Sequence, residues 1–282
     1  MNQMHEVERH ELTLGGLTTS YLAAGGPSAP PVVLLHDGTW GGAAETAWAG
    51  VIPLLATRYH VIAPDLYGYG RSSKMVQLDV APYTFRLRQV AALLDAVGLG
   101  ATPAHVVGNS FGGAMALRAS TTPWFAWRMK SGVSIAGTGG PYRTKESLAS
   151  LSQFDGTRAD MLRIVRLLTG DFAGIEAHVD LRMRNASDPG HYRAVAAAGL
   201  PTPFATTERV DEYPESLRHV TVPLALVSGL DDDLVEPGWA GKIAQCARSC
   251  AVYEIEAKHS PNISDPEHTA RLLADILATF EQ

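Results

Sequence analysis

The sequence predicts an α/β protein built on a mostly parallel sheet. From 31 to 137, short apolar runs alternate with segments whose apolar residues recur at helical spacing. The run Pro31–Leu35 is apolar at every position, which is typical of a strand buried on both faces of a parallel sheet. The same alternation resumes at Val222. Strands that alternate with helices in this order predict right-handed crossovers within one sheet.

The individual elements follow from the pattern and its glycine and proline boundaries. The chain opens with two alternating segments around Gly15 and Gly16, which predict an antiparallel hairpin. Gly98 and Gly100 end the second helix of the alternating region. We expect strands at 11–14, 17–22, 31–35, 59–65, 105–107, 132–136, 222–229 and 251–255, and helices at 47–57, 84–97, 113–121, 239–247 and 266–280.

Residues 140–216 interrupt the alternation. Two helical patterns, 161–168 and 175–183, occur here with no strong strand between them, and prolines punctuate the stretch. We therefore expect a core formed by 1–139 and 217–282, with 140–216 inserted as a helical lid over the strand ends.

Composition excludes several classes of protein. The 282 residues are 46% hydrophobic, enough for one large domain with a substantial core, and the net charge of −6 without a basic block argues against nucleic acid as a partner. No secretory signal or membrane-spanning apolar segment is visible, so we expect a cytoplasmic protein without a membrane partner. Cys246 and Cys250 lack the further ligands of a zinc site, and we expect neither a metal nor a cofactor.

The most informative stretch is the Gly-x-Ser-x-Gly motif at 108–112. A short strand enters it and a helix leaves it, which is the order that a nucleophile elbow requires. Gly108 and Gly112 would let strand and helix approach closely. Ser110 is therefore the candidate nucleophile, with backbone N–H groups at the start of the next helix available to an oxyanion.

Two later strands end in residues that could activate this serine. Asp231, Asp232 and Asp233 follow the strand at 222–229, and His259 follows the last strand. We assign His259 as the general base and Asp231 as the acid that orients it, with Asp232 as second choice.

The turn His36–Gly42 follows the first parallel strand. Its glycines could leave backbone N–H groups free to contribute to an oxyanion site, although a loose connection between strand and helix accounts for them equally well. His36, Ser110 and the turn after Asp65 all fall at the carboxyl ends of strands, where ligands bind in such sheets.

The order Ser110, Asp231, His259 around a lid resembles the α/β-hydrolase superfamily, over essentially the full chain. Within it, Val107–Ala114 and Trp48–Arg71 are most similar to the meta-cleavage product hydrolases, which cut C–C bonds in 2-hydroxy-6-oxo-dienoates. The resemblance implies a mostly parallel eight-stranded sheet flanked by helices, with the lid inserted after the sixth strand. It also implies ketonisation of the dienol, followed by attack on the ketone and C–C cleavage.

The same resemblance implies roles for residues around the serine. Arg182 on the lid would bind a substrate carboxylate, and Asn109 would contact the substrate. The oxyanion donors would be the N–H groups of Phe111 and of Gly38 or its neighbour.

The resemblance is incomplete around the pocket. Asp37, Thr39 and Trp40 replace two glycines and a proline of the family's turn, and Lys258 and Ser260 flank the histidine where a glycine and an aromatic residue are usual. Asp37 and Trp40 are expected to contact the substrate, a small molecule bearing a carboxylate.

Because the pocket departs from the family, an ester, lactone or thioester hydrolase with the same triad stays open. A ligand-binding protein or a non-hydrolytic catalyst on this fold is the remaining class. The sequence does not decide whether the chain forms a homo-oligomer.

Overall fold

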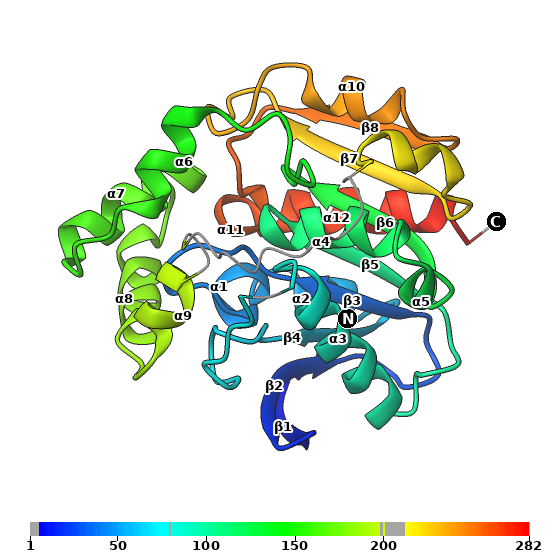
Figure 1. The fold of residues 1–282 in the computed structure, drawn as a ribbon, viewed down its shortest axis with the longest axis horizontal. Coiled ribbons are helices and arrows are strands. Elements are labelled where there is room, and N and C mark those ends of the chain that lie inside the picture. The colour runs from blue at the N-terminus through cyan, green and yellow to red at the C-terminus, as the bar shows by residue number, and fades with distance from the viewer. Residues whose placement is uncertain (1–5, 79, 198–199, 201–211, 282) are drawn as a thin grey trace.

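The computed structural model describes residues 6–78, 80–197, 200 and 212–281. One eight-stranded sheet runs through them in the order β1-β2-β4-β3-β5-β6-β7-β8 (Figure 1). The first hairpin is antiparallel and pairs antiparallel with β4, whereas every pairing from β4 to β8 is parallel. The predicted mostly parallel sheet is confirmed. The strands are β1 (Glu8–Leu14), β2 (Leu17–Ala24), β3 (Pro31–Leu35), β4 (His60–Pro64), β5 (Ala104–Asn109), β6 (Met129–Ile135), β7 (Leu224–Gly229) and β8 (Cys250–Ile255).

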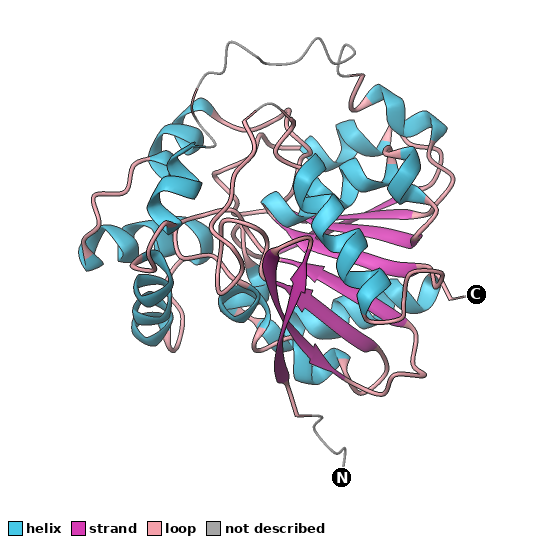
Figure 2. Cartoon of the chain, turned by 60° about the horizontal axis from the view of Figure 1, so that its bottom comes forward, coloured by secondary structure: helices cyan, strands magenta, loops and turns pink. Residues whose placement is uncertain are grey.

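Helices cover both faces of this sheet (Figure 2). On one face, α1 (Ala44–Trp48), α2 (Ile52–Leu55) and α12 (Pro266–Thr279) pack against one set of strand side chains. On the other, α3 (Thr84–Ala96), α4 (Phe111–Ser120) and α5 (Pro123–Ala126) pack against the alternate set. The short helix α10 (Trp239–Ala244) packs against β7, and α11 (Pro261–Ser264) precedes α12.

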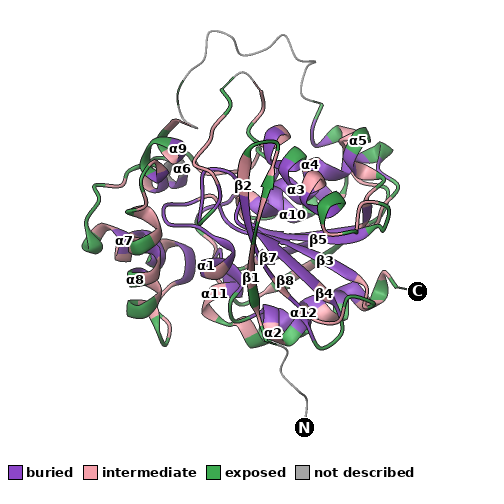
Figure 3. Ribbon diagram, turned by 90° about the horizontal axis from the view of Figure 1, so that it is seen from below, coloured by how far each residue is buried: buried purple, intermediate pink, exposed green. Residues whose placement is uncertain are grey.

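Burial on both faces explains the continuous apolar runs. In β3, Val32 and Leu34 belong to the cluster beneath α1 and α12, while Val33 and Leu35 belong to the cluster beneath α3 and α4. Side chains alternate between faces along a strand, so a strand covered on both sides is apolar at every position. Figure 3 shows the central strands buried along their length.

In its described residues, the segment predicted as a lid contains four α-helices between β6 and β7. They form a group at one end of the sheet, at the left of Figure 1. An apolar cluster of Met161, Ile164, Val165, Leu168 and Val179 holds α7 and α8 together and includes Trp40 of the core. The helices are α6 (Lys145–Ser152), α7 (Arg158–Thr169), α8 (Ile175–Ala186) and α9 (His191–Ala197). Residues 198–199 and 201–211 of the predicted 140–216 insertion lie outside the described residues, so its boundaries stay a prediction.

Two parts of the predicted element pattern were wrong. The single helix expected at 47–57 is broken into α1 and α2, because Gly50 lies against Pro266 and Pro53 stands in the first turn of α2. The helices α5, α6, α9 and α11 were not predicted from the sequence at all.

None of the described helices is long and apolar enough to cross a membrane. Cys246 and Cys250 are free thiols, and the described residues contain no group of three histidine, cysteine or acidic side chains that could hold a metal ion.

Candidate active site

Ser110 occupies a strained turn between β5 and α4. Its φ of 55° and ψ of −114° lie outside the regions that non-glycine residues normally adopt. A Cβ at Gly108 would lie 2.1 Å from backbone atoms of Gly112, and a Cβ at Gly112 would lie 2.1 Å from the Leu35 carbonyl oxygen. Both glycines of the motif are therefore required by close backbone approach, which allows the helix to start directly after the serine.

A chain of hydrogen bonds connects Ser110 to a buried carboxylate. The Ser110 Oγ lies 2.8 Å from Nε2 of His259, and Nδ1 of the same ring lies 2.7 Å from Oδ2 of Asp232. The carboxylate can only accept at Nδ1, so that nitrogen carries the proton and Nε2 accepts from the serine hydroxyl. The side chains of His259 and Asp232 are 2% and 1% exposed, respectively. This arrangement can remove a proton from the serine as it attacks a carbonyl carbon.

The choice of Asp231 as the acid was wrong, because Asp232 is the aspartate that contacts His259. Asp231 is exposed, and its backbone N–H donates to the Ala257 carbonyl. Asp232 turns inward instead, where its other carboxylate oxygen also accepts a hydrogen bond from the Leu234 N–H at 2.9 Å. The spacing of three adjacent aspartates did not reveal which of them would turn toward the histidine.

Phe111 and Gly38, whose backbone N–H groups are the predicted oxyanion donors, lie next to each other. A Cβ on Gly38 would lie 2.9 Å from the Phe111 Cβ, so the two residues are in close contact. The Gly38 carbonyl is fixed by a 2.8 Å hydrogen bond from the Tyr69 hydroxyl. Among the described residues, neither N–H donates a hydrogen bond. Both residues line the same cavity as Ser110, so these donors are available to an oxyanion there.

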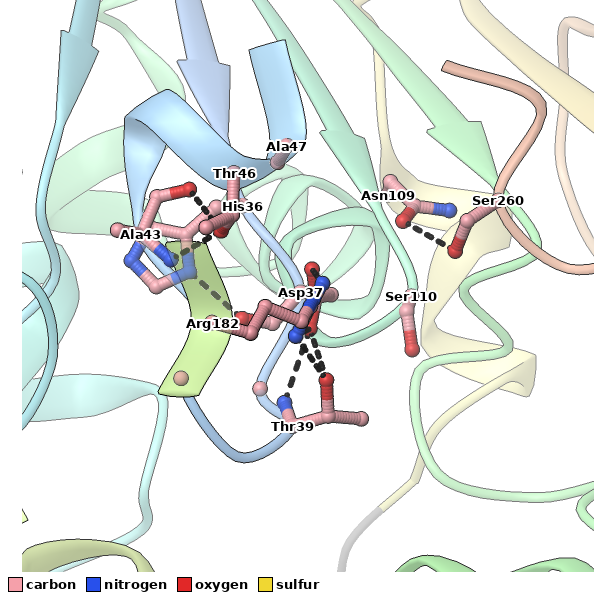
Figure 4. Close-up of polar contacts among 12 residues, drawn as sticks. His36, Asp37, Thr39, Ala43, Thr46, Ala47, Asn109, Ser110, Arg182 and Ser260 are labelled. Carbon is pink, nitrogen blue, oxygen red and sulfur yellow. Dashed lines mark hydrogen bonds and ion pairs between the residues drawn. The ribbon is translucent and has the colours of Figure 1, made fainter. Parts of the chain in front are cut away.

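The residues predicted to bind a substrate carboxylate, Arg182 and Asp37, bind each other. Arg182 Nη2 lies 2.7 Å from Asp37 Oδ2, and both side chains are 0% exposed (Figure 4). The remaining guanidinium donors reach Thr39 Oγ1 at 2.7 Å, the Trp40 carbonyl at 3.0 Å and His178 Nε2 at 3.0 Å. The substrate-binding role predicted for these two residues is therefore corrected, because every donor group of the guanidinium already has a partner.

Electrostatics keep Asp37 ionised despite complete burial. Burial alone would raise its pKa, but the Arg182 charge and the hydrogen bonds from Arg182 and Thr39 outweigh burial and hold the pKa well below its usual range. The carboxylate points into this ion pair, which accommodates an acidic residue next to the candidate oxyanion donors.

The buried His191 holds the inserted helices against the core, and the partly buried His178 contacts Arg182 on its own helix. His191 Nε2 accepts a hydrogen bond from the Gly41 N–H at 3.0 Å, and its Nδ1 lies 3.2 Å from the Gly68 carbonyl. Burial lowers the pKa of His191 to about 4. Burial and the neighbouring Arg182 charge lower the pKa of His178 to about 3. Both rings are therefore neutral at pH 7.

Asn109, predicted to contact the substrate, instead holds the loop that carries His259 and Ser260. It is 0% exposed, and its Nδ2 donates to the His259 carbonyl at 2.9 Å. Its Oδ1 accepts from the Ser260 hydroxyl at 3.0 Å, and Figure 4 shows its side chain turned toward Ser260. Its amide is thus used within the protein, and the substrate-contact prediction is corrected. Ser260, which departs from the family pattern, is the partner that uses this asparagine.

A cavity of about 320 Å³ opens beside Ser110. Trp40, predicted as a pocket residue, does line it, and its indole N–H donates to the Leu151 carbonyl at 3.0 Å. Sequence reasoning missed Arg143, which lines the same cavity from the loop after β6. Its position beyond the carboxyl end of a central strand was the available signal. The lining residues are Gly38, Thr39, Trp40, Ser110, Phe111, Arg143, Leu151, Ser152, Val195 and Ala196.

Comparison with known proteins places this geometry in a family. Residues 32–272 match the model of the "Alpha/beta hydrolase family". The chain belongs to this family. It is 31% identical over 261 residues to the 2-hydroxy-6-oxo-6-(2'-aminophenyl)hexa-2,4-dienoic acid hydrolase of Metapseudomonas resinovorans, covering 85% of this chain and 84% of that protein.

Solved structures of alpha/beta hydrolases agree with this membership. A serine hydrolase involved in carbazole degradation, the CarC enzyme, superposes with a TM-score of 0.79 at 27% identity, covering 97% of this chain and 100% of that one. The 2-hydroxy-6-oxo-6-phenylhexa-2,4-dienoate hydrolase of Rhodococcus sp. strain RHA1 gives a TM-score of 0.81 at 24% identity, covering 96% and 98%. The latter supports the fold alone. The chain is thus a hydrolase of the alpha/beta family whose relatives include meta-cleavage product hydrolases.

Proposed function

We propose that this protein is a serine hydrolase that attacks the carbonyl carbon of a small molecule with Ser110. The observation that carries the proposal is the hydrogen-bond chain from Ser110 through His259 to Asp232. Ser110 faces a cavity that is also lined by Phe111 and Gly38, whose backbone N–H groups are not used in hydrogen bonds among the described residues. A nucleophile, a base, an orienting acid and an oxyanion site are thus supplied together.

The geometry supports the following sequence of steps. The Ser110 oxygen bonds to the carbonyl carbon while its proton passes to His259 Nε2, and Asp232 stabilises the resulting imidazolium. The carbonyl oxygen takes the electron pair of the broken π bond and is held by the N–H groups of Phe111 and Gly38. When the adduct collapses, the leaving group takes the proton from His259. Water, deprotonated by the same ring, then attacks the acyl carbon, the acyl–Oγ bond breaks, and the ring returns the proton to Ser110 Oγ.

For the substrate, the first candidate is a 2-hydroxy-6-oxo-dienoate in its keto form, cleaved at the C–C bond next to the ketone. The leaving group is then a carbanion delocalised as a dienolate, and protonation completes the cleavage. The relative that is 31% identical across most of the chain is named for hydrolysis of such a compound, which supports this candidate.

The second candidate is an ester, lactone or thioester, and one observation favours it. The arginine predicted to hold the dienoate carboxylate is fully paired with Asp37 inside the protein. The carboxylate clamp implied by the family resemblance is therefore not available at that position, while the attack on an acyl carbon is unaffected.

We also propose that α6 to α9 act as a lid over the cavity. Leu151 and Ser152 of α6 and Val195 and Ala196 of α9 line the cavity opposite Ser110, so substrate entry depends on these helices.

The test is turnover by wild type and Ser110→Ala of a coloured ring-fission dienoate beside a p-nitrophenyl ester. The proposal predicts that the wild type cleaves at least one of them and that S110A cleaves neither while remaining folded by circular dichroism. Cleavage of the ester alone selects the second candidate. Turnover by S110A equal to wild type, or a wild type inert toward every acyl substrate, contradicts the proposal and favours a ligand-binding member of the fold.

A further inference from the structure

Arg143 lines the candidate catalytic cavity from a rigid position. It belongs to the loop between β6 and α6, and its backbone forms an antiparallel bridge with Val235. On one side, the Glu236 N–H donates to the Tyr142 carbonyl at 2.8 Å; on the other, the Thr144 N–H donates to the Leu234 carbonyl at 3.4 Å. These bonds attach the Arg143 backbone to the loop that also carries Asp232, so the backbone of Arg143 is held beside the triad.

The guanidinium of Arg143 has no partner in the part of the chain that the structure describes: it makes neither a hydrogen bond nor an ion pair there. Arg143 is partly buried, and this desolvation lowers its pKa. Arginine has five N–H donors, so a guanidinium without a protein partner at the cavity wall can bind an anion that enters the cavity. Arg182 is the contrast, because its donors reach Asp37, Thr39, Trp40 and His178.

The charges around Arg143 leave room for an anion. The carboxylate whose charge acts on it is Asp232. Asp232 is already occupied by His259 and the Leu234 N–H, and it forms no ion pair with Arg143. Arg143 lines the same cavity as Ser110 and Phe111, so an anion bound by the guanidinium lies in the cavity that holds the candidate nucleophile.

We propose that Arg143 binds a carboxylate of the substrate, in place of Arg182. This inference rests on the proposed function, because it requires the substrate's acyl carbon to lie at Ser110. The planar guanidinium can hold a carboxylate through two parallel N–H···O bonds. A cavity of about 320 Å³ fits a small molecule that carries both groups: the carbonyl at Ser110 and the carboxylate at Arg143. The substrate class is therefore a short acyl or keto compound with a free acid group.

A matched pair of esters tests this assignment: mono(4-nitrophenyl) glutarate, which carries a free carboxylate, and its methyl ester, which does not. The readout is the ratio of kcat/KM for the acid to kcat/KM for the methyl ester. Arg143→Gln is expected to lower this ratio about 10- to 100-fold, the effect of losing a charge-assisted hydrogen-bond pair, with the change mainly in KM. Arg143→Lys should retain part of the ratio because it keeps the charge.

The control variant is Arg184→Gln, which removes an exposed arginine of α8 and should leave the ratio unchanged. A ratio in R143Q within twofold of wild type overturns the proposal. So does an equal loss for both esters, because Arg143 would then act through Asp232 and not on the substrate.

Binding separates this proposal from the proposed function. Isothermal titration of the monoester into S110A and into S110A/R143Q measures the carboxylate contact without turnover. We expect measurable binding to S110A and a 10- to 100-fold weaker association in the double variant. Equal affinities, or no binding to S110A, overturn the assignment of Arg143. Turnover that survives in S110A instead overturns the role of Ser110.

Discussion

Arg182 of α8 and Asp37 of the loop after β3 form a completely buried ion pair, 2.7 Å between Nη2 and Oδ2, at the contact between the inserted helices and the core. A charge pair in this position joins two parts of the chain that are 145 residues apart. It fixes the loop that carries Gly38, and it removes from substrate binding the arginine that family resemblance assigned to it.

Breaking this pair should destabilise the protein. Asp37→Asn leaves the Arg182 charge buried and uncompensated, which costs about 3–5 kcal/mol in the free energy of unfolding. Urea denaturation followed by circular dichroism measures the change, and R184Q is the control with no buried partner. The opposite outcome would show that Arg182 binds the substrate. In that case Arg182→Gln would keep the free energy of unfolding of the wild type and would raise KM for the glutarate monoester but not for its methyl ester.

Stability should fall as the pH is lowered from about 6.5 toward 4. The pKa of His191 is lowered to about 4 and that of His178 to about 3 from an ordinary value of 6.5, so the unfolded chain takes up protons first. The stabilisation is complete above pH 6.5 and is lost as the pH falls through this window, with up to about 3 kcal/mol from His191. His191→Gln, whose amide oxygen can accept from the Gly41 N–H, should show a shallower loss between pH 7 and pH 4.5 in urea titrations. An unchanged pH dependence in H191Q would contradict the assigned role of this ring.

Substitutions of the two adjacent aspartates, Asp231 and Asp232, should have very different effects on kcat. Asp232→Asn removes the acceptor that holds His259 in the required tautomer and should lower kcat by about 10⁴-fold. Asp231→Asn alters an exposed side chain and should stay near wild type in steady-state kinetics on the same ester. The reverse order of effects would show that the loop rearranges when substrate binds.

Asn109 should act as a positioning residue. Asn109→Ala leaves the His259 carbonyl and the Ser260 hydroxyl without their partner, which costs about 1–3 kcal/mol in the free energy of unfolding. Its kcat should fall while KM stays close to wild type, because the side chain holds the histidine loop and does not reach the cavity. Ser260→Ala removes one of these bonds and should show a smaller loss of both stability and kcat. A raised KM in N109A with normal stability would instead indicate a substrate contact.

The sequence was sufficient for the sheet and for bringing Ser110 and His259 to one site, for physical reasons. Apolar runs that are buried on both faces can be recognised without tertiary information, and the carboxyl ends of parallel strands meet at one edge. That rule brings Ser110 and His259 together from opposite ends of the chain. The glycines at 108 and 112 indicate the close approach of strand and helix backbones that the elbow requires.

What the sequence could not supply was the direction of individual side chains. The sequence pattern does not distinguish Asp231 from Asp232, because both follow the same strand. The conformation of the turn decides which of them faces His259. Whether Arg182 meets a substrate or a carboxylate of its own chain depends on a contact across 145 residues, although the unusual Asp37 was a hint that it had a partner. Arg143 stood in a stretch without helical or strand periodicity, so its place in the cavity followed only from the fold.

The most direct test of the central claim is labelling with a fluorophosphonate, which reacts with activated serines, followed by intact-mass and peptide mass spectrometry. The account predicts one phosphonate per chain, located on Ser110, with loss of ester hydrolysis in proportion to labelling, no label in S110A and slow labelling in D232N. A label on another serine, or equal labelling of S110A, would contradict the assignment of Ser110 as the nucleophile.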